Sequence, residues 1–205
     1  MNLHRLLRER AEAGKPVRVG LVGAGKFGTM FLAQALRTPG LHLMAVADLA
    51  PARARDAMTR VGWPAERIAA ANLDQASEKG TTFIGDDAAA AIAAPQIEVV
   101  IDATGVPAAG IRHALLAIER GKHVIMVNVE ADVLAGSLLA ERAAKAGVIY
   151  SMAYGDQPAL IAELVDWARA VGFDVVAAGK GTKYLPIYHA STPETVWGYY
   201  GLTPE

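Results

Sequence analysis

Short runs of apolar residues alternate along this chain with longer segments that have the composition of helices. The apolar runs stand at residues 17–22, 41–47, 82–84, 96–101, 123–127 and 148–152. The helical segments between them are residues 26–37, 52–60, 65–73, 106–120 and 135–146. Alternation of buried strands with helices over short loops is typical of a parallel sheet covered on both faces. We therefore predict an α/β fold with a doubly wound parallel (Rossmann) sheet.

This alternation continues without a linker or a repeat as far as residue 153. A short amphipathic helix precedes the first strand, with Leu3, Leu6 and Leu7 on one side. We predict that residues 1–153 form a dinucleotide-binding Rossmann domain that begins with this helix.

Residues 154–205 have a different character. They are predicted to hold an exit helix at 159–171, a last strand at 174–178 and the start of a truncated substrate-binding or dimerisation region. From Gly179 onward the sequence is loop-rich, aromatic and polar, and it is too short for a substrate-binding sheet of its own. We expect this tail to be loosely ordered or buried against a second copy of the chain, so a homo-oligomer is predicted.

Composition narrows the function classes. The chain has 205 residues, of which 53% are hydrophobic and 20% charged, and its net charge is −1. This balance favours a globular protein and gives no sign of nucleic-acid binding. No apolar run reaches the roughly 18 residues of a membrane span, and the charged N-terminus does not look like a secretion signal. We expect a cytoplasmic protein that does not bind membranes.

Cysteine is absent from the chain. This absence excludes disulfides, thiolate metal sites and cysteine nucleophiles, and with them the phosphorylating aldehyde dehydrogenases. The five histidines do not stand at metal-ligand spacings, so no metal site is predicted.

The first strand is followed by the pattern G-x-G-x-x-G, formed by Gly23, Gly25 and Gly28. In dinucleotide sites the first glycine allows a tight turn, the second lets the pyrophosphate approach the backbone, and the third lets the helix pack against the strand. The helix that begins near Lys26 and Phe27 would present its N–H groups to the phosphates. These five residues are predicted to bind the cofactor.

The second strand ends at Asp48, twenty residues after Gly28, where an acid can accept hydrogen bonds from the adenosine ribose. A carboxylate there favours NAD over NADP. Arg53 and Arg55 follow closely, and either could accommodate a 2′-phosphate or belong to a solvated helix face. The predicted cofactor is therefore NAD or NADP, with Asp48 and Arg53 in contact with it.

Further polar residues follow the next two strands, where ligands of open parallel sheets bind. Thr104 and Gly105 are predicted near the nicotinamide ribose, and Asp102 either joins them or caps the next helix. Asn128 is predicted to bond the nicotinamide side or the substrate.

The candidate catalytic residues are Glu130, Asp156 and Lys180. Glu130 could act as an acid or base or bind the substrate, whereas the neighbouring Asp132 is predicted to be a helix N-cap. Asp156 stands at the start of the exit helix and could cap it or face the cleft. Lys180 could hold a substrate phosphate or carboxylate or donate a proton, and the same holds for a second loop lysine, Lys183. His189, in the tail, is a further candidate for the site.

Several motifs together resemble the homoserine-dehydrogenase-like oxidoreductases. They are Val-Gly-Ala-Gly-Lys-Phe-Gly (22–28), Ile-Asp-Ala-Thr-Gly (101–105), Met-Val-Asn-Val-Glu-Ala-Asp-Val (126–133), Val-Ile-Tyr-Ser (148–151), Gly-Asp-Gln-Pro (155–158) and Ala-Gly-Lys-Gly (178–181). They look most like the branch with a C-terminal SAF-type domain, which includes the 1-deoxyxylulose 5-phosphate reductoisomerase-like enzyme. The resemblance covers essentially this whole chain and about the N-terminal half of the family's usual length.

Two functions stay open at this point. The first, which the resemblance implies, is NAD(P)-dependent oxidation or reduction of a small polar substrate. A phosphorylated substrate is one alternative within this function. The second is a dinucleotide-binding regulatory module without turnover. The polar loop around Lys180 favours the first function, and the incomplete substrate region favours the second.

Overall fold

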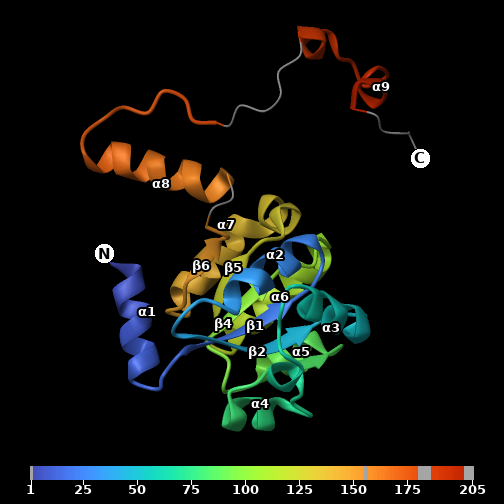
Figure 1. Cartoon of the computed structure of the whole chain (residues 1–205). Coiled ribbons are helices and arrows are strands. Elements are labelled where there is room, and N and C mark those ends of the chain that lie inside the picture. Colours follow the sequence, from blue (N-terminus) through green and yellow to red (C-terminus); the bar gives the residue numbers. More distant parts are fainter. Residues whose placement is uncertain (1, 155–156, 180–185, 201–205) are drawn as a thin grey trace. The chain divides into compact units, whose positions relative to one another are not determined.

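The computed structural model of the protein describes residues 2–154, 157–179 and 186–200. The chain divides into two compact units, and the boundary follows Tyr154. The first unit holds the sheet and the helices that cover it (Figure 1).

The centre of the first unit is a six-stranded parallel sheet with the strand order β3-β2-β1-β4-β5-β6 (Figure 1). Its strands are β1 (Val17–Val22), β2 (Leu41–Ala47), β3 (Phe83–Gly85), β4 (Val99–Asp102), β5 (His123–Met126) and β6 (Tyr150–Met152). The strand order reverses between β1 and β4, and this reversal creates a crevice beyond their carboxyl ends where ligands bind in such sheets. The prediction of a doubly wound parallel sheet is confirmed.

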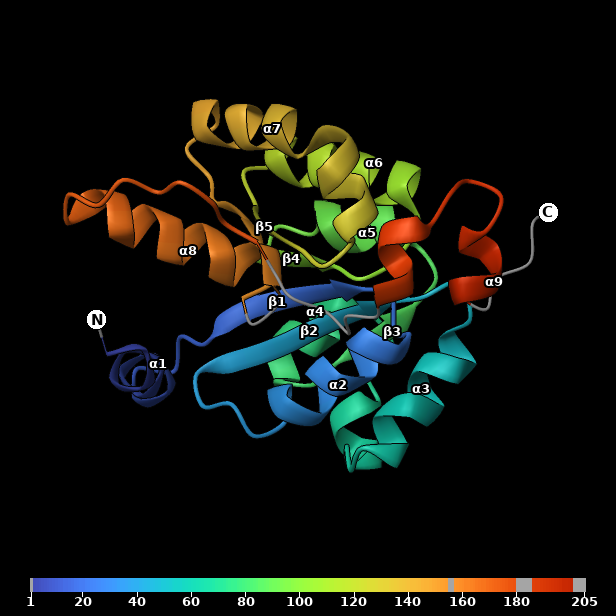
Figure 2. The ribbon, with the colours of Figure 1, turned by 90° about the horizontal axis from the view of Figure 1, so that it is seen from above.

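Helices cover both faces of this sheet. They are α1 (Leu3–Glu12), α2 (Lys26–Ala35), α3 (Pro51–Arg60), α4 (Leu73–Lys79), α5 (Ala88–Ala93), α6 (Pro107–Glu119) and α7 (Val129–Lys145), with the 3₁₀ helix η1 (Ala65–Ile68). Figure 2 shows α2 and α3 on one face and α5, α6 and α7 on the other. Successive strand residues point to opposite faces, so Val100 packs in the cluster under α5, α6 and α7 and Ile101 in the cluster under α2 and α3.

Some sequence expectations within the first unit are corrected. Residues 65–73 do not form one helix, because η1 ends at Ile68 and α4 begins at Leu73. Helix α7 begins at Val129 rather than near residue 135. Its N-cap is Asn128, whose side chain accepts a hydrogen bond from the N–H of Ala131, so the prediction that Asp132 caps the helix is wrong.

The described part of the second unit contains α8 (Gln157–Ala170), η2 (Pro186–Ala190) and α9 (Val196–Tyr200). Residues 173–179 lie in neither a helix nor a strand, so the strand expected at 174–178 is not formed. That segment has an apolar sequence, but no strand within the described ranges pairs with it, and an unpaired strand leaves its backbone groups without partners. Within the described ranges of both units, we found no helix with the length and apolar character needed to cross a membrane.

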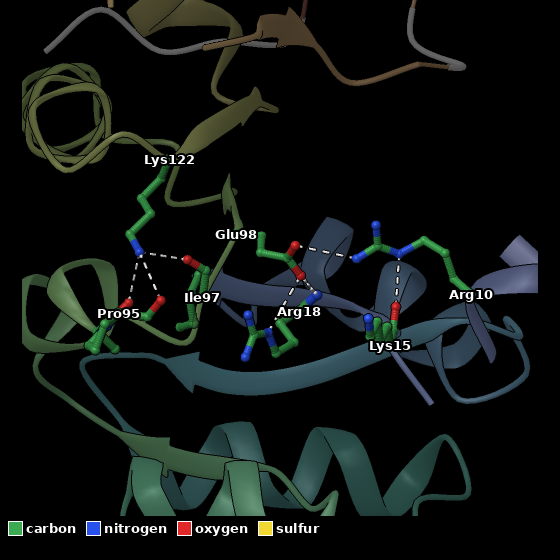
Figure 3. Close-up of polar contacts among 8 residues, drawn as sticks. Arg10, Lys15, Arg18, Pro95, Ile97, Glu98 and Lys122 are labelled. Atoms are coloured by element: carbon green, nitrogen blue, oxygen red, sulfur yellow. Dashed lines mark hydrogen bonds and ion pairs between the residues drawn. The ribbon is translucent and has the colours of Figure 1, made fainter. Parts of the chain in front are cut away.

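The amino-terminal edge of the sheet is held by two charged side chains (Figure 3). Glu98, just before β4, accepts hydrogen bonds from the backbone N–H of Arg18 and from the guanidinium groups of Arg18 and Arg10. These contacts join α1, β1 and β4. Burial opposes ionisation of Glu98, but the Arg18 N–H and the two nearby arginines outweigh it and hold the Glu98 pKa below its usual value.

Lys122, just before β5, is only 8% exposed. Its ammonium donates to the carbonyl oxygens of Ala94 at 3.0 Å, Pro95 at 3.4 Å and Ile97 at 2.7 Å (Figure 3). These carbonyls follow α5 and would otherwise lack part of their hydrogen bonding. Burial lowers the Lys122 pKa. Side-chain hydrogen bonds therefore join the elements of the amino-terminal edge, and a hollow of about 690 Å³ lined by Arg10, Arg18 and Glu98 among others lies beside them.

Candidate functional site

The turn after β1 has the geometry that its glycines predict. Gly23 has φ +94°, and a Cβ atom there would stand 2.7 Å from the carbonyl oxygen of Ala103. A Cβ atom on Gly28 would clash with the carbonyl oxygen of Gly23, so only glycine lets α2 approach the turn this closely. Gly25 is different, because nothing lies within 4 Å of the position of its missing Cβ. Open space at Gly25 is what a phosphate group that approaches the backbone requires.

Helix α2 presents free backbone N–H groups beside that space. Its N-cap is Gly25, which makes no side-chain capping bond. The first N–H groups of a helix have no partner within the helix, so those of Lys26, Phe27 and Gly28 are available to an anion. The Lys26 and Phe27 side chains are exposed. The turn thus offers hydrogen-bond donors and the positive end of a helix dipole at one place.

Asp48 lies directly after β2 and is tied to the glycine turn. Its Oδ2 accepts from the Ala24 N–H at 2.8 Å, and its Oδ1 accepts from the Ala50 N–H at 2.9 Å and from Arg53 at 3.1 Å. Burial alone would raise the pKa of Asp48, but these hydrogen bonds hold it below its usual value. Asp48 therefore carries a negative charge at neutral pH and can accept further hydrogen bonds from hydroxyl groups.

Two hollows meet at Arg53. A cavity of about 380 Å³ contains Gly23, Asp48 and Thr104 in its wall, together with apolar side chains of the neighbouring loops. A more open groove of about 530 Å³ is lined by Lys26, Arg53 and Arg60 among others. The first hollow suits a nucleoside and the second suits an anionic group. Arg55 belongs to neither, because its guanidinium donates to the Ile68 carbonyl at 2.7 Å.

The loop after β4 is fixed by Asp102 and Asn128. Asn128, only 2% exposed, donates to the Val106 carbonyl at 3.0 Å and to Thr104 Oγ1 at 3.2 Å, besides capping α7. Gly105, with φ +69°, is exposed at the rim. Asp102 does not cap the next helix, whose N-cap Val106 makes no side-chain bond. Instead it accepts from Thr104 Oγ1 at 2.9 Å. Direct contacts of Thr104, Gly105 and Asn128 with a cofactor stay predictions.

His113 is a site residue that sequence reasoning missed. Its Nδ1 lies 2.6 Å from Oδ2 of Asp102, and its ring borders the same cavity as Asp48. The spacing along the sequence contains a signal for it. His113 lies three residues after Gly110 and four before Ala117, both of which are buried, so it shares their face of the helix. A polar ring at that spacing stands on the helix face that meets the sheet.

The predicted catalytic residues are not brought together by the described part of the structure. Glu130 is exposed in the first turn of α7. Asp132 accepts a hydrogen bond from the Tyr150 hydroxyl at 2.8 Å. Asp156, Lys180 and Lys183 lie outside the described residues, and His189 lies in η2 of the second unit. No three His, Asp or Glu side chains within the described ranges are placed to hold a metal ion.

The reversed strand order, the glycine turn and the acid after β2 define the first unit as a dinucleotide-binding Rossmann domain, with NAD or NADP as its cofactor. Residues 17–154 match the family described as the oxidoreductase family with an NAD-binding Rossmann fold (GFO/IDH/MocA). The match covers more than half of the chain, so the chain belongs to this family. Residues 155–201 match a second description, the catalytic domain of oxidoreductase DRL.

Solved structures show the same fold. An oxidoreductase from Klebsiella pneumoniae is 21% identical with a TM-score of 0.52, over 76% of this chain and 40% of that one. An NAD-binding oxidoreductase from the same organism is 24% identical with a TM-score of 0.51, over 77% of this chain and 39% of that one. An oxidoreductase from Bacillus subtilis is 19% identical with a TM-score of 0.51, over 76% of this chain and 39% of that one.

The chain therefore spans about 40% of the length of the structures that it matches. A comparison with curated proteins gave no match.

Proposed function

We propose that this chain binds NAD(P) in its first unit and serves the oxidation or reduction of a small polar carbonyl or hydroxy compound. The observation that carries the proposal is the open space at Gly25 beside the free N–H groups of α2. The family membership of residues 17–154 supports it. The match of residues 155–201 to a catalytic domain supports turnover over a purely regulatory role.

The residues have separate tasks in this proposal. Gly25 and the N–H groups of Lys26 and Phe27 hold the pyrophosphate, and Gly23 and Gly28 shape the turn. Asp48 accepts hydrogen bonds from the adenosine ribose. Nicotinamide, when bound, supplies or accepts a hydride.

Beyond β4 and β5, the loop residues Thr104 and Gly105 orient the nicotinamide ribose, and Asn128 fixes that loop. Glu130, Asp156 and Lys180 bind the substrate and move its proton. Glu130 is supported by its place in the first turn of α7, directly after β5, where a carboxylate is stabilised by the helix dipole.

Finer parts of the proposal rest on the sequence motifs, on the tail after Gly179 and on the composition. They are membership of the homoserine-dehydrogenase-like branch with a SAF-type domain, a homo-oligomeric state and a cytoplasmic location. For this branch we propose a small polar substrate, with a phosphorylated compound as one alternative.

The experiment that tests the cofactor site is a titration of NADH and NADPH followed by nicotinamide fluorescence. Gly25→Val places a branched side chain in the open space at the turn, and we expect it to weaken both dinucleotides at least tenfold. Gly198→Val is a matched control, since Gly198 also has nothing within 4 Å of its missing Cβ and no positive φ, but lies in α9 of the second unit. Unchanged affinity in Gly25→Val would place the site elsewhere.

Turnover is tested on the same preparation with a panel of small hydroxy acids, aldehydes and sugar phosphates. The chain is compared with a version extended through the length of the related structures. We expect the 205-residue chain to bind cofactor and to turn over substrate poorly, with activity gained on extension. Cofactor binding with no turnover in either version would favour the regulatory module instead.

A further inference from the structure

Asp102 is the most deeply buried carboxylate in the first unit, with 0% exposure. Its Oδ1 accepts from the Thr104 N–H at 3.3 Å, from the Thr104 hydroxyl at 2.9 Å and from the Asn128 amide at 3.4 Å. Its Oδ2 faces Nδ1 of His113 at 2.6 Å. A buried carboxylate needs such partners. Because an ionised carboxylate only accepts, the proton in the last contact lies on Nδ1.

This arrangement fixes the other nitrogen of His113. With the proton on Nδ1, neutral imidazole has a lone pair on Nε2, which can accept a hydrogen bond. The only hydrogen bond of the ring within the described part of the chain is the one from Nδ1 to Asp102. The side chain is 18% exposed and borders the cavity that Asp48 also borders. His113 therefore presents an acceptor with a defined orientation to a ligand in that cavity.

Close packing of α6 on α7 keeps the pair in place. A Cβ atom on Gly110 would stand 2.7 Å from the Asn128 amide nitrogen and 3.0 Å from the Ala131 Cβ. Gly110 thus lets α7 come near enough for Asn128 to reach Asp102 and the Val106 carbonyl. The position of His113 is therefore fixed by its own helix α6, by α7 and by β4.

The cavity has two chemically different parts. Asp48 and Gly23 belong to the strand ends and the glycine turn, and a carboxylate suits the ribose hydroxyls. The rest of the lining includes the apolar residues Leu49, Ala88 and Val106, and beside them stand His113 and the charged residues Asp86 and Arg112. Mostly apolar walls with a few placed polar groups are the usual surroundings of a flat heterocycle. Since Asp48 takes the ribose, the base falls to this second part.

We propose that His113 is a specificity-determining residue that accepts a hydrogen bond from the exocyclic amino group of adenine through Nε2. Asp102 is the positioning residue that keeps the proton on Nδ1. This inference rests on the proposed cofactor site. It predicts discrimination against hypoxanthine, which carries a carbonyl oxygen in place of the amino group, because two acceptors would then face each other.

The test compares binding of NADH and of reduced nicotinamide hypoxanthine dinucleotide, followed by nicotinamide fluorescence. We expect the unmodified protein to prefer NADH about tenfold, which corresponds to one well-placed hydrogen bond. His113→Leu keeps much of the side-chain volume and removes both nitrogens, and we expect its preference to fall below twofold. Arg112→Ala changes another residue of the same cavity and is expected to keep the preference.

Asp102→Asn should reverse the preference for adenine, whereas His113→Leu should only abolish it. Its Oδ1 can still accept from Thr104 and Asn128, which leaves an amide N–H facing Nδ1 of His113. The imidazole must then accept at Nδ1 and carry its proton on Nε2. We expect the preference to reverse in favour of the hypoxanthine dinucleotide. An unchanged preference for adenine in His113→Leu overturns the inference.

A second measurement needs no substitution. In the protein labelled with ¹⁵N-histidine, the NMR signal of His113 reports directly which ring nitrogen carries the proton. We expect the proton on Nδ1 and the Nε2 signal to shift on addition of NADH. A protonated Nε2, or a signal that NADH leaves unchanged while the fluorescence titration shows binding, contradicts the inference. Failure of the Gly25→Val test would instead contradict the proposed cofactor site, so the two failures are distinguishable.

Discussion

The backbone N–H of Ala24 donates a hydrogen bond to Oδ2 of Asp48 over 2.8 Å. This bond joins the glycine turn after β1 to the end of β2, the two segments assigned to the pyrophosphate and to the ribose. The same carboxylate accepts from Arg53, which borders the groove that contains Lys26. One side chain therefore connects the parts of the site that we propose to distinguish NAD from NADP.

Asp48 and Arg53 should have opposite effects on cofactor choice. Asp48→Asn removes the charge that repels a 2′-phosphate, and we expect the ratio of NADPH to NADH affinity to rise about tenfold. Arg53→Ala should weaken NADPH more than NADH, by a similar factor, since its side chain, although paired with Asp48, is 70% exposed and can reach a phosphate. Fluorescence titration with both cofactors measures the two ratios. If each variant changes both affinities equally, the assignment of these residues is wrong.

The tight packing of α2 on the turn predicts a large effect at Gly28. In Gly28→Ala the new methyl group meets the Gly23 carbonyl oxygen, so the turn or the helix must shift. We expect the free energy of unfolding to fall by about 2–3 kcal/mol, as for overpacked sites. Gly25→Ala is the matched control, because its methyl group has no neighbour within 4 Å and its φ is −68°. Urea unfolding of the two variants checks the difference, and equal stability of both would contradict the packing argument.

Glu98 should make stability depend on acidity. Its pKa is lowered in the folded protein, so it contributes stability above its unfolded pKa, near 4.3. That contribution is lost as the pH falls through the lower folded pKa. Glu98→Gln should therefore unfold more easily at pH 7 and show a flatter loss of stability below about pH 4.

The matched control for Glu98 is Glu141→Gln. Glu141 pairs with Lys145 on the surface of α7 with 61% of its side chain exposed, and such pairs contribute little. Thermal unfolding between pH 3 and pH 7 separates the two variants. A pH profile of Glu98→Gln that matches the unmodified protein would contradict the role given to Glu98.

Removal of the Lys122 ammonium should destabilise the first unit. Lys122→Met keeps the apolar stem and leaves the carbonyls of Ala94 and Ile97 without that donor, so we expect a loss of about 2–3 kcal/mol. Lys145→Met, at an exposed position, should change stability by less than about 0.5 kcal/mol. Chemical unfolding measures both losses. Equal losses in the two variants would show that the buried contacts of Lys122 contribute nothing.

The sequence predicted those parts of the fold that depend on short segments of the chain. The sheet, the glycine turn and Asp48 could be predicted, because apolar runs, glycine spacing and the acid after β2 are properties of short segments. The strand expected at 174–178 failed, since a strand needs a partner and an apolar sequence does not show whether one is present.

The candidate site was predictable only in part for the same reason. The pairing of Asp102 with His113 depends on how α6 lies against β4, which spacing along the chain does not reveal. Asn128 rather than Asp132 caps α7, because only Val127 and Asn128 separate the end of β5 from the start of the helix. Asp156 and Lys180 stay predictions outside the described residues.

The position of Lys122 has a consequence for the stability of the first unit in the presence of chelators. Three backbone carbonyls converge on its ammonium in the manner of oxygen ligands around a metal ion. A bound metal ion at such a place can be stripped by chelators or diluted away, but a covalently tethered cation cannot. This corner of the fold should therefore be insensitive to EDTA and to dialysis, because its cation is a side chain of the protein itself.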